Sequence, residues 1–470
     1  MFEYGLVHMV LITFSVCIFG YLYAIPGLVL IVIAIDKMIG YFGYTRLNHV
    51  ELINSYEYKT KNYHISGYME IDKINYEEFE ETFIIRALTK IRKLRRILVF
   101  KLGIGLWKDI PISEAAHQII KDDKELQSHQ EIIDYCCELN NQPMDRARPL
   151  WEFRVIENYT DKTSLLIYRT HHCFMDGVGF ASLMSTLNDD QFATQLNKSF
   201  VMPTAIEKAK YAITAPLNLK EMDSITGEWN TDEKAKKIEE SKAGDHYTSK
   251  FYASKEYNFK DIRKCYKQYP KMTFNGFVFS ILGKSFDQLF KHHGINDAKK
   301  LVTQFPVNMR PLPTSYENII IDNFFTMSTV ELPLMQDMNT IHETINPYFH
   351  KLIIDKFLYA SYYLLKVVAY LPKVLSLMMV EAYVQKVDAA VSNIAFSDVP
   401  WKINGKEIKN ITMNNAAVFH MSVGLIVYTY NKKVRFGMNI KKDMKMDSNK
   451  LMDILLSNIE EEIQKTCKTE

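Results

Sequence analysis

The stretch "YRTHHCFMDGVGFASLM", residues 168–184, places two adjacent histidines four to five residues ahead of an aspartate and a glycine. The apolar run "SLLIY" before the histidines is typical of a buried strand. After them, Phe180, Leu183, Met184 and Leu187 are spaced as one face of a helix. The sequence therefore predicts a strand-to-helix turn over His171–Gly179. Loops that rigid elements hold in this way often carry chemistry.

Several roles suit the side chains of this turn. His171, His172, Cys173 and Asp176 are all capable metal ligands, but adjacent strand residues point to opposite faces, so we expect no metal here. Cys173 as a nucleophile lacks a separate activating base. A structural role remains open, with a histidine bonded in the core and Asp176 capping the helix.

General-base catalysis is the chemistry that uses most of the motif. A histidine with an unperturbed pKa near 6.5 can take a proton from a hydroxyl and later return it. Strand alternation lets His172 face a channel while His171 packs behind it. We expect Asp176 to fix the loop by hydrogen bonds or to pair with an arginine. Gly177 and Gly179 would allow close backbone approach and unusual dihedral angles beside a substrate carbonyl.

Strands and helices alternate on both sides of the motif. A chain of 470 residues exceeds one ordinary core, which favours two lobes. The pattern predicts an α/β fold in which an N-terminal lobe (residues 45–190) and a C-terminal lobe (residues 246–470) each carry a mixed sheet. Residues 191–245 are polar and are predicted to form a linker or crossover.

The N-terminus is strongly apolar. Between Glu3 and Asp36 there is no Asp, Glu, Lys or Arg, and about 20 apolar residues suffice to cross a bilayer. We therefore predict a membrane anchor within residues 1–40, either one span or a hairpin turning at Pro26. Lys37 and Arg46 follow it, so the positive-inside rule places the body in the cytosol. The expected location is the endoplasmic reticulum membrane, or a lipid droplet.

Composition and charge limit the kinds of partner and compartment to expect. A formal net charge of +2 argues against nucleic-acid binding. Six cysteines without a CxxC pair indicate a reducing compartment. The apolar region 352–387 is interrupted by lysines and a proline, which favours helices packed on the core and touching a membrane surface over a second span. The basic run at residues 90–96 is either a solvated helix face or a contact for anionic headgroups or phosphates.

Several stretches, taken in order, resemble one known family. His171-His172-x-x-x-Asp176-Gly177 resembles the signature of condensing-type acyltransferases with a chloramphenicol-acetyltransferase-like fold, and of their wax ester synthase/diacylglycerol acyltransferase branch in particular. Further stretches resemble elements of that branch: "RPLWEFRVIE" its Pro-Leu-Trp element, "TFNGFVFSILGKSF" its Asn-Asp helix, "FPVNMR" its Pro-Val-Ser-x-Arg strand, "VSNIAFSDVPW" its Ser-Asn element and "SVGLIVYTYNKKVRFGMNIKKD" its closing hairpin.

The resemblance implies two lobes around an interlobal tunnel, and transfer of a long acyl group from acyl-CoA to a fatty alcohol or diacylglycerol. It implies catalytic roles for His172, His171, Asp176 and Gly177, with acyl-CoA as co-substrate and no cofactor. The oxyanion donor would be a backbone N–H near Gly177 or the Asn275 amide. The remaining substrate-binding residues that it implies are Pro149, Trp151, Ser392 and Asn393.

Two departures bear on this expectation. Gly276 stands where the family has an aspartate beside Asn275, and Ala395-Phe396-Ser397 replaces Gly-Pro after Ser392-Asn393. They leave acceptor specificity and pocket shape open. They also keep a second hypothesis open, in which the chain retains the fold as a lipid-binding or lipid-droplet scaffold.

Overall fold

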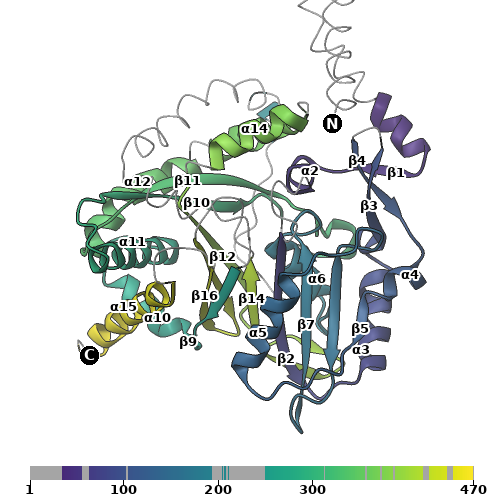
Figure 1. The fold of residues 1–470 in the computed structure, drawn as a ribbon, viewed down its shortest axis with the longest axis horizontal. Coiled ribbons are helices and arrows are strands. Elements are labelled where there is room, and N and C mark those ends of the chain that lie inside the picture. Colours follow the sequence, from purple (N-terminus) through teal and green to yellow (C-terminus); the bar gives the residue numbers. More distant parts are fainter. Residues whose placement is uncertain are drawn as a thin grey trace, which may run out of the picture.

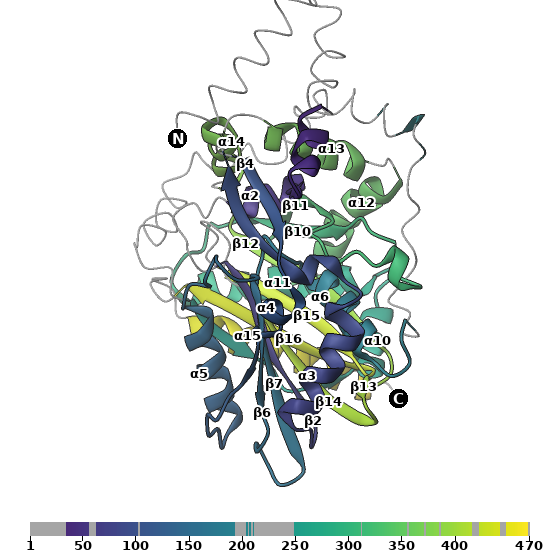
Figure 2. The same cartoon turned by 90° about the vertical axis from the view of Figure 1, so that its right-hand side faces the viewer.

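The computed structural model describes residues 34–55, 63–101, 104–192, 249–311, 313–354, 357–370, 373–384, 387–415, 423–441 and 448–468, together with a few single positions between 204 and 210. Within them, α helices surround two large mixed sheets and one small sheet (Figures 1 and 2). The α/β class expected from the alternating pattern is confirmed.

The first large sheet carries the double-histidine motif. Its order is β13-β14-β2-β7-β6-β5. The strands are β2 (His64–Asp72), β5 (Ile119–Lys121), β6 (Trp151–Ile156), β7 (Thr163–His171), β13 (Lys402–Ile403) and β14 (Lys406–Asn415). β7 is central, and His171 ends it opposite His64 of β2. The motif therefore begins where a buried strand ends, as its sequence predicts.

The second large sheet is built from the C-terminal half. Its order is β11-β10-β12-β15-β16-β8, with β9 pairing β16 beside that path. The strands are β8 (Ser249–Ala253), β9 (Tyr257–Asn258), β10 (Lys300–Asn308), β11 (Phe325–Pro333), β12 (Ala389–Ser397), β15 (Val423–Tyr430) and β16 (Lys433–Lys441). The predicted β15–β16 hairpin is present, and Asn431 and Lys432 adopt the positive φ angles that a tight two-residue turn requires.

Helices cover the sheets, and polar caps begin several of them. Asn75, Ser128, Asp176, Asn258 and Thr273 each accept a backbone N–H of the first turn that they precede. The helices are α2 (His49–Ser55), α3 (Tyr76–Phe83), α4 (Ile112–Ala116), α5 (His129–Asn140), α6 (Gly177–Leu187), α10 (Phe259–Lys267), α11 (Phe274–His292), α12 (Met338–Ile354), α13 (Phe357–Tyr370), α14 (Lys373–Val384) and α15 (Ser448–Lys468). A short helix also spans residues 34–41.

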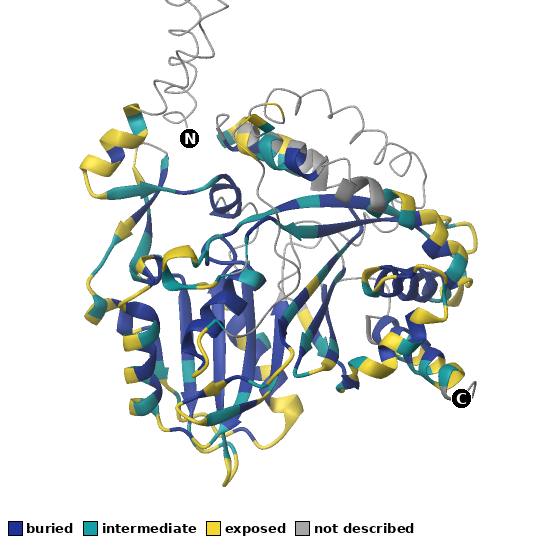
Figure 3. Cartoon of the chain, turned by 180° about the vertical axis from the view of Figure 1, so that it is seen from behind, coloured by how far each residue is buried: buried dark blue, intermediate teal, exposed yellow. Residues whose placement is uncertain are grey.

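The sheets do not follow the predicted division into residues 45–190 and 246–470. β13 and β14 belong to the second half of the chain but complete the first sheet, because β14 pairs with β2. Each large sheet lines its own buried hydrophobic cluster, seen as the dark interior of Figure 3. The proposed linker at residues 191–245 lies almost entirely outside the described residues.

A third sheet was not anticipated. β1 (Tyr44–Arg46), β3 (Arg96–Lys101) and β4 (Ile104–Asp109) form it in the order β1-β4-β3. The basic run at residues 90–96 ends here, and it is not a free cationic face. Arg92 and Arg96 pair with Asp109, while Lys93 is buried between Glu51 and Asp322.

The described residues test the membrane predictions only in part. Most of the anchor predicted within residues 1–40 lies outside the described residues. Within the described ranges, none of the helices has the length and apolarity needed to cross a membrane. The region 352–387 forms α13, α14 and the end of α12. The alternative of a second span there is therefore not supported, whereas helices packed on the core are observed.

Candidate active site

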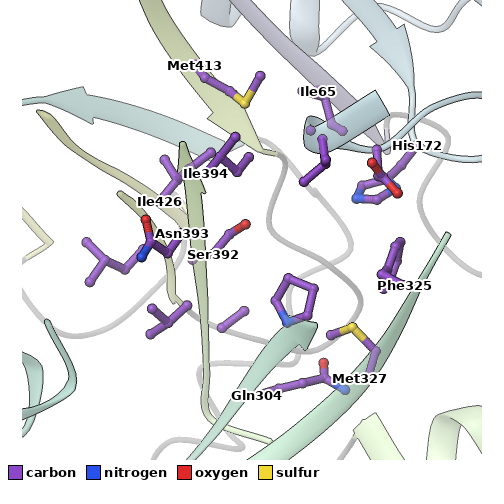
Figure 4. Close-up of a pocket in the computed structure, with 18 of the residues that line it drawn as sticks. Ile65, His172, Gln304, Phe325, Met327, Ser392, Asn393, Ile394, Met413 and Ile426 are labelled. Carbon is purple, nitrogen blue, oxygen red and sulfur yellow. The ribbon is translucent and has the colours of Figure 1, made fainter. Parts of the chain in front are cut away.

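His172 lies in the turn between β7 and α6, at the edge of a pocket between the two large sheets (Figure 4). Its backbone N–H bonds to the carbonyl of Tyr63 (2.8 Å), which fixes the turn against the entrance to β2. The Tyr63 ring stacks on the imidazole at 4.5 Å between centroids, and Phe325 of β11 meets it edge-on at 6.0 Å. The imidazole is thus held between aromatic rings and still lines the pocket.

The two histidines face different surroundings, as the alternation predicts. His171 is not among the pocket-lining residues; it packs edge-on against His64 and Tyr63. Its Nδ1 accepts the N–H of Cys173 (3.1 Å), which tightens the turn. The Cys173 side chain is fully buried in the first core, so the nucleophile hypothesis has no geometric support.

One buried amide fixes the orientation of His172. Asn323 donates through Nδ2 to the His172 carbonyl (2.6 Å), and its Oδ1 lies 3.2 Å from His172 Nδ1. The first bond sets which way the amide points, so Oδ1 accepts the proton of Nδ1. Asn54 of α2 lies farther away, 3.5 Å from the same two atoms. This arrangement leaves Nε2 as the basic nitrogen.

The protonation state of His172 suits a base. Burial lowers its pKa below the ordinary value; bonds to its own backbone and to Asn323, together with the Asp176 charge, oppose this only in part. A lowered pKa keeps the imidazole neutral at neutral pH. His172 is therefore able to accept a proton there.

Asp176 holds the turn instead of facing a substrate. Arg310, which follows β10 in the other sheet, contacts both carboxylate oxygens, with Nη1 at 2.7 Å from Oδ1. The N–H groups of Gly179 (2.7 Å) and Phe324 (3.0 Å) also donate to it. Burial by itself would raise the pKa of Asp176, but Arg310 and these bonds hold it below its usual value. The predicted arginine partner is thus Arg310.

Gly177 and Gly179 serve close packing. A Cβ on Gly177 would lie 2.2 Å from Ile394 Cδ1, and one on Gly179 would lie 2.4 Å from the Ile321 carbonyl oxygen. Neither has a positive φ angle, so the expected unusual dihedral angles are wrong. The close approach observed is to other protein atoms, and approach to a substrate carbonyl stays a prediction. Gly177 and Val178 open α6 and line the pocket. The first N–H groups of a helix have no intrahelical acceptor, which makes these two available to an oxyanion.

Only some of the substrate-binding residues implied by the resemblance line the pocket. Ser392 and Asn393 of β12 line the pocket, and Asn393 Nδ2 donates to Asn275 Oδ1 (2.7 Å). Asn275 does not line the pocket and reaches it only through Asn393. Of the two oxyanion donors considered, the structure therefore places only the Gly177 region beside His172.

Pro149 and Trp151 do not contact the pocket, so a substrate-binding role is not supported. Trp151 is 1% exposed, its ring stacks on Phe83 at 5.2 Å, and its Nε1 donates to the Leu94 carbonyl (2.9 Å). The Pro149 carbonyl accepts from Gln118 (2.9 Å). Both residues fix the start of β6 in the first core.

The two departures also lie in packed surroundings. A Cβ on Gly276 would lie 2.8 Å from His342 Nδ1, so a histidine from α12 fills the space beside this position. Phe396 is fully buried against Phe180, Trp401 and Tyr428. Neither residue contacts His172, and the proton-accepting geometry is intact.

A network of buried charges backs the site. Glu51 and Asp322 flank Lys93, and Trp107 Nε1 donates to Glu51 (2.9 Å). Burial raises the pKa of Glu51 to about 7, against the attraction of Lys93. Asp322 precedes Asn323, so this network anchors the segment whose amide bonds to His172.

Sequence reasoning missed five residues around His172: Tyr63, Asn54, Arg310, Asn323 and Phe325. Only Arg310 had a signal in the sequence, as the arginine of "FPVNMR".

Among the described residues, no cluster of three or more histidine, cysteine or carboxylate side chains is placed to hold a metal ion. The pocket walls are mainly aliphatic and aromatic: Ile65, Phe325, Met327, Val391, Ile394, Met413, Leu425 and Ile426. A neutral imidazole, helix-terminal N–H groups and apolar walls together suit proton transfer on a long apolar substrate.

Solved structures of other proteins share this fold. A wax ester synthase/diacylglycerol acyltransferase from Marinobacter aquaeolei has a similar structure, with a TM-score of 0.58 and 16% identity over 90% of this chain and all of that one. The first condensation domain of the CDA synthetase is also similar, with a TM-score of 0.57 and 12% identity over 89% and 94% of the two chains. At such identities the likeness shows the fold alone.

The sequence comparisons are more specific. The model of the wax ester synthase/diacylglycerol acyltransferase catalytic domain matches residues 127–225, and that of the C-terminal domain of the same family matches residues 324–463. The chain belongs to this family. It is 26% identical over 126 residues to a probable diacylglycerol O-acyltransferase of Mycobacterium tuberculosis and 33% identical over 88 residues to wax ester synthase/diacylglycerol acyltransferase 1 of Arabidopsis thaliana. These alignments cover 26% and 18% of this chain, and 27% and 18% of the relatives.

Proposed function

We propose that this protein is a membrane-associated O-acyltransferase that moves a long acyl group from acyl-CoA to a lipid alcohol. The acceptor would be a fatty alcohol or diacylglycerol, and the product a wax ester or triacylglycerol. The observation that carries the proposal is the neutral His172 imidazole, held through Nδ1 by Asn323, in an apolar pocket that also contains the start of α6. Family membership supports the reaction class.

The geometry supports a mechanism without a covalent enzyme intermediate. His172 Nε2 takes the hydroxyl proton as the alcohol oxygen attacks the thioester carbonyl. The N–H groups of Gly177 and Val178 stabilise the oxyanion that develops. The carbon–sulfur bond then breaks, and His172 returns the proton to the departing CoA thiolate. A positioned base contributes about 10²–10⁴-fold and an oxyanion donor about 10²–10³-fold.

The location rests on sequence. The run between Glu3 and Asp36 has no Asp, Glu, Lys or Arg, which suits a protein whose acceptor and product partition into a bilayer. The endoplasmic reticulum membrane, with the body in the cytosol, stays a prediction. A tunnel open at both ends stays a prediction as well.

An acceptor panel tests the proposal. Full-length protein would be incubated with labelled long-chain acyl-CoA and, separately, a fatty alcohol, a diacylglycerol and a sterol, followed by chromatography of the esters. We expect ester with at least one acceptor and a loss of about 10²–10⁴-fold in His172→Ala. His117→Ala, at an exposed histidine, is the matched control and should keep full activity.

The outcomes separate the hypotheses. Normal ester formation by folded His172→Ala would refute the base assignment. No ester from the native protein with any acceptor would favour the lipid-binding scaffold. Thermal unfolding of each variant shows whether a loss of activity is a loss of folding.

A further inference from the structure

Among the described side chains of α14, those on the outer face are apolar and exposed. Val374, Leu375, Met378 and Met379 are 46%, 47%, 60% and 41% exposed, and their spacing places them on one side of the helix. The opposite side is anchored, because Ser376 is buried and Leu377 and Val380 pack against the first core. A surface helix of a globular protein normally carries polar residues on its outer side.

A second uncovered apolar group lies at the same end of the molecule. Met38, Tyr41 and Phe42 are 55%, 87% and 65% exposed, in and just after the helix at residues 34–41. Figures 1 and 2 both place this helix and α14 at one end, and Figure 3 shows exposed residues on both. Patches of this kind mark interaction sites.

The neighbouring sequence and charges indicate which partner contacts these exposed apolar side chains. The helix at residues 34–41 directly follows residues 4–33, which contain no Asp, Glu, Lys or Arg. Lys37 is exposed on this helix and Lys366 is exposed on α13, which packs on α14. Cations beside an apolar face favour anionic headgroups. We propose that the outer face of α14, together with residues 38–42, docks on a phospholipid bilayer. The side chains would enter the interface as those of an in-plane amphipathic helix do.

The docking surface lies one helix layer from the catalytic histidine. α14 packs on α13, and α13 packs on α2 and β11. Tyr362 of α13 contacts His49 of α2 (4.5 Å between ring centroids) and Phe324 (5.8 Å). α2 also supplies Asn54, and β11 supplies Phe325, to His172. If the proposed function holds, the bilayer presents the alcohol on the His172 side of the protein.

Tryptophan scanning with brominated lipid tests the docking directly. Full-length Met378→Trp and Val399→Trp would be mixed with vesicles of phosphatidylcholine and phosphatidylglycerol, with or without brominated phosphatidylcholine, and the native emission subtracted. Val399 is a matched control, because it is 53% exposed and lies in the loop that leads from β12 to β13. Figure 2 shows β13 away from α14.

We expect bromine to quench the Met378→Trp emission at least about twofold more than that of Val399→Trp. Equal quenching would overturn the proposal. So would Met378→Trp emission that is blue-shifted without vesicles and insensitive to bromine, because the chain itself would then cover this face. Neither readout requires acyl transfer, so failure of the proposed function would not be mistaken for failure of the docking.

Kinetics supply a second test. In Leu375→Glu/Met378→Glu, the KM for diacylglycerol in vesicles should rise about tenfold, while the KM for a soluble short-chain alcohol stays unchanged. Ile85→Glu/Val399→Glu carries the same change at apolar positions that are 56% and 53% exposed and should alter neither value. A rise that is equal for both acceptors, or equal in both double variants, would contradict the docking.

Discussion

The side-chain amide of Asn323 makes two hydrogen bonds to His172, one to its carbonyl and one to Nδ1. Replacing the amide with a carboxylate tests whether these bonds set the protonation of His172. Asn323→Asp puts a carboxylate beside Nδ1, which favours the imidazolium form and raises the pKa of His172. In the native protein burial lowers this pKa, so activity should fall only as the pH drops below 6.5. The acidic limb of kcat/KM should move to higher pH by about one unit or more in the variant.

The matched control for this change is Asn158→Asp. Asn158 is exposed, and its Oδ1 accepts a hydrogen bond from Lys73 Nζ (2.8 Å). It makes none of the contacts that hold His172. Its acidic limb should coincide with that of the native protein. An unshifted limb in folded Asn323→Asp would show that Asn323 does not set the protonation of His172.

For single residues, the sequence identified His172 but not the residues that contact and orient it. His172 and Asp176 belong to one short motif whose spacing is visible in the chain. Asn54, Tyr63 and Asn323 come from separate elements and have no local signature, because sequence spacing carries no record of which turns meet in space. Trp151 was misassigned for a related reason: a core aromatic and a substrate-binding aromatic look alike in sequence.

Among the elements, the pairing of β2 with β14 imposes the tightest contact. Gly67 of β2 lies opposite Met413 of β14 and Tyr168 of β7. A Cβ here would lie 1.9 Å from the Thr412 carbonyl oxygen and 2.7 Å from Tyr168 Oη. Gly67→Ala must push the strands apart, and we expect it to lower the free energy of unfolding by about 2–3 kcal/mol, measured by urea denaturation.

Gly424→Ala makes the same change in β15, where the nearest atom would be the Asn439 carbonyl oxygen at 3.9 Å. It should alter the free energy of unfolding by less than about 1 kcal/mol. If the two alanine variants were equally stable, the close approach of β14 to β2 would be wrong.

Local patterns predicted the elements better than their partners. The apolar run and helical spacing around the motif located β7 and α6, and the family resemblance located α11 and the β15–β16 hairpin. The crossing of β13 and β14 into the first sheet was missed, because strand order depends on tertiary packing that periodicity does not encode. The sheet of β1, β3 and β4 was missed because its strands are short and partly charged, as in "YTR".

For the whole molecule, Asp176 and Arg310 form a buried ion pair between the turn after one large sheet and the segment after a strand of the other. Their side chains are 8% and 1% exposed. Arg310→Met would leave the carboxylate buried without its counter-charge, and losing one partner of such a pair costs about 3–5 kcal/mol. Urea denaturation should show a loss of this size. The exposed pair Arg148–Asp145 provides the control, since Arg148→Met should cost under about 1 kcal/mol.

The double variant separates the charge from the packing. Asp176→Asn in the Arg310→Met background removes the stranded charge and keeps an acceptor oxygen for one of the two N–H groups, that of Gly179 or that of Phe324, which in the native protein donate to different carboxylate oxygens. It should therefore be more stable than Arg310→Met alone, with a coupling energy of about 1–3 kcal/mol in the double-mutant cycle. Additive losses would mean that the two side chains act independently. In that case the turn that carries His172 would owe its position to contacts within its own sheet, and the ion pair would not hold the two sheets in register across the pocket.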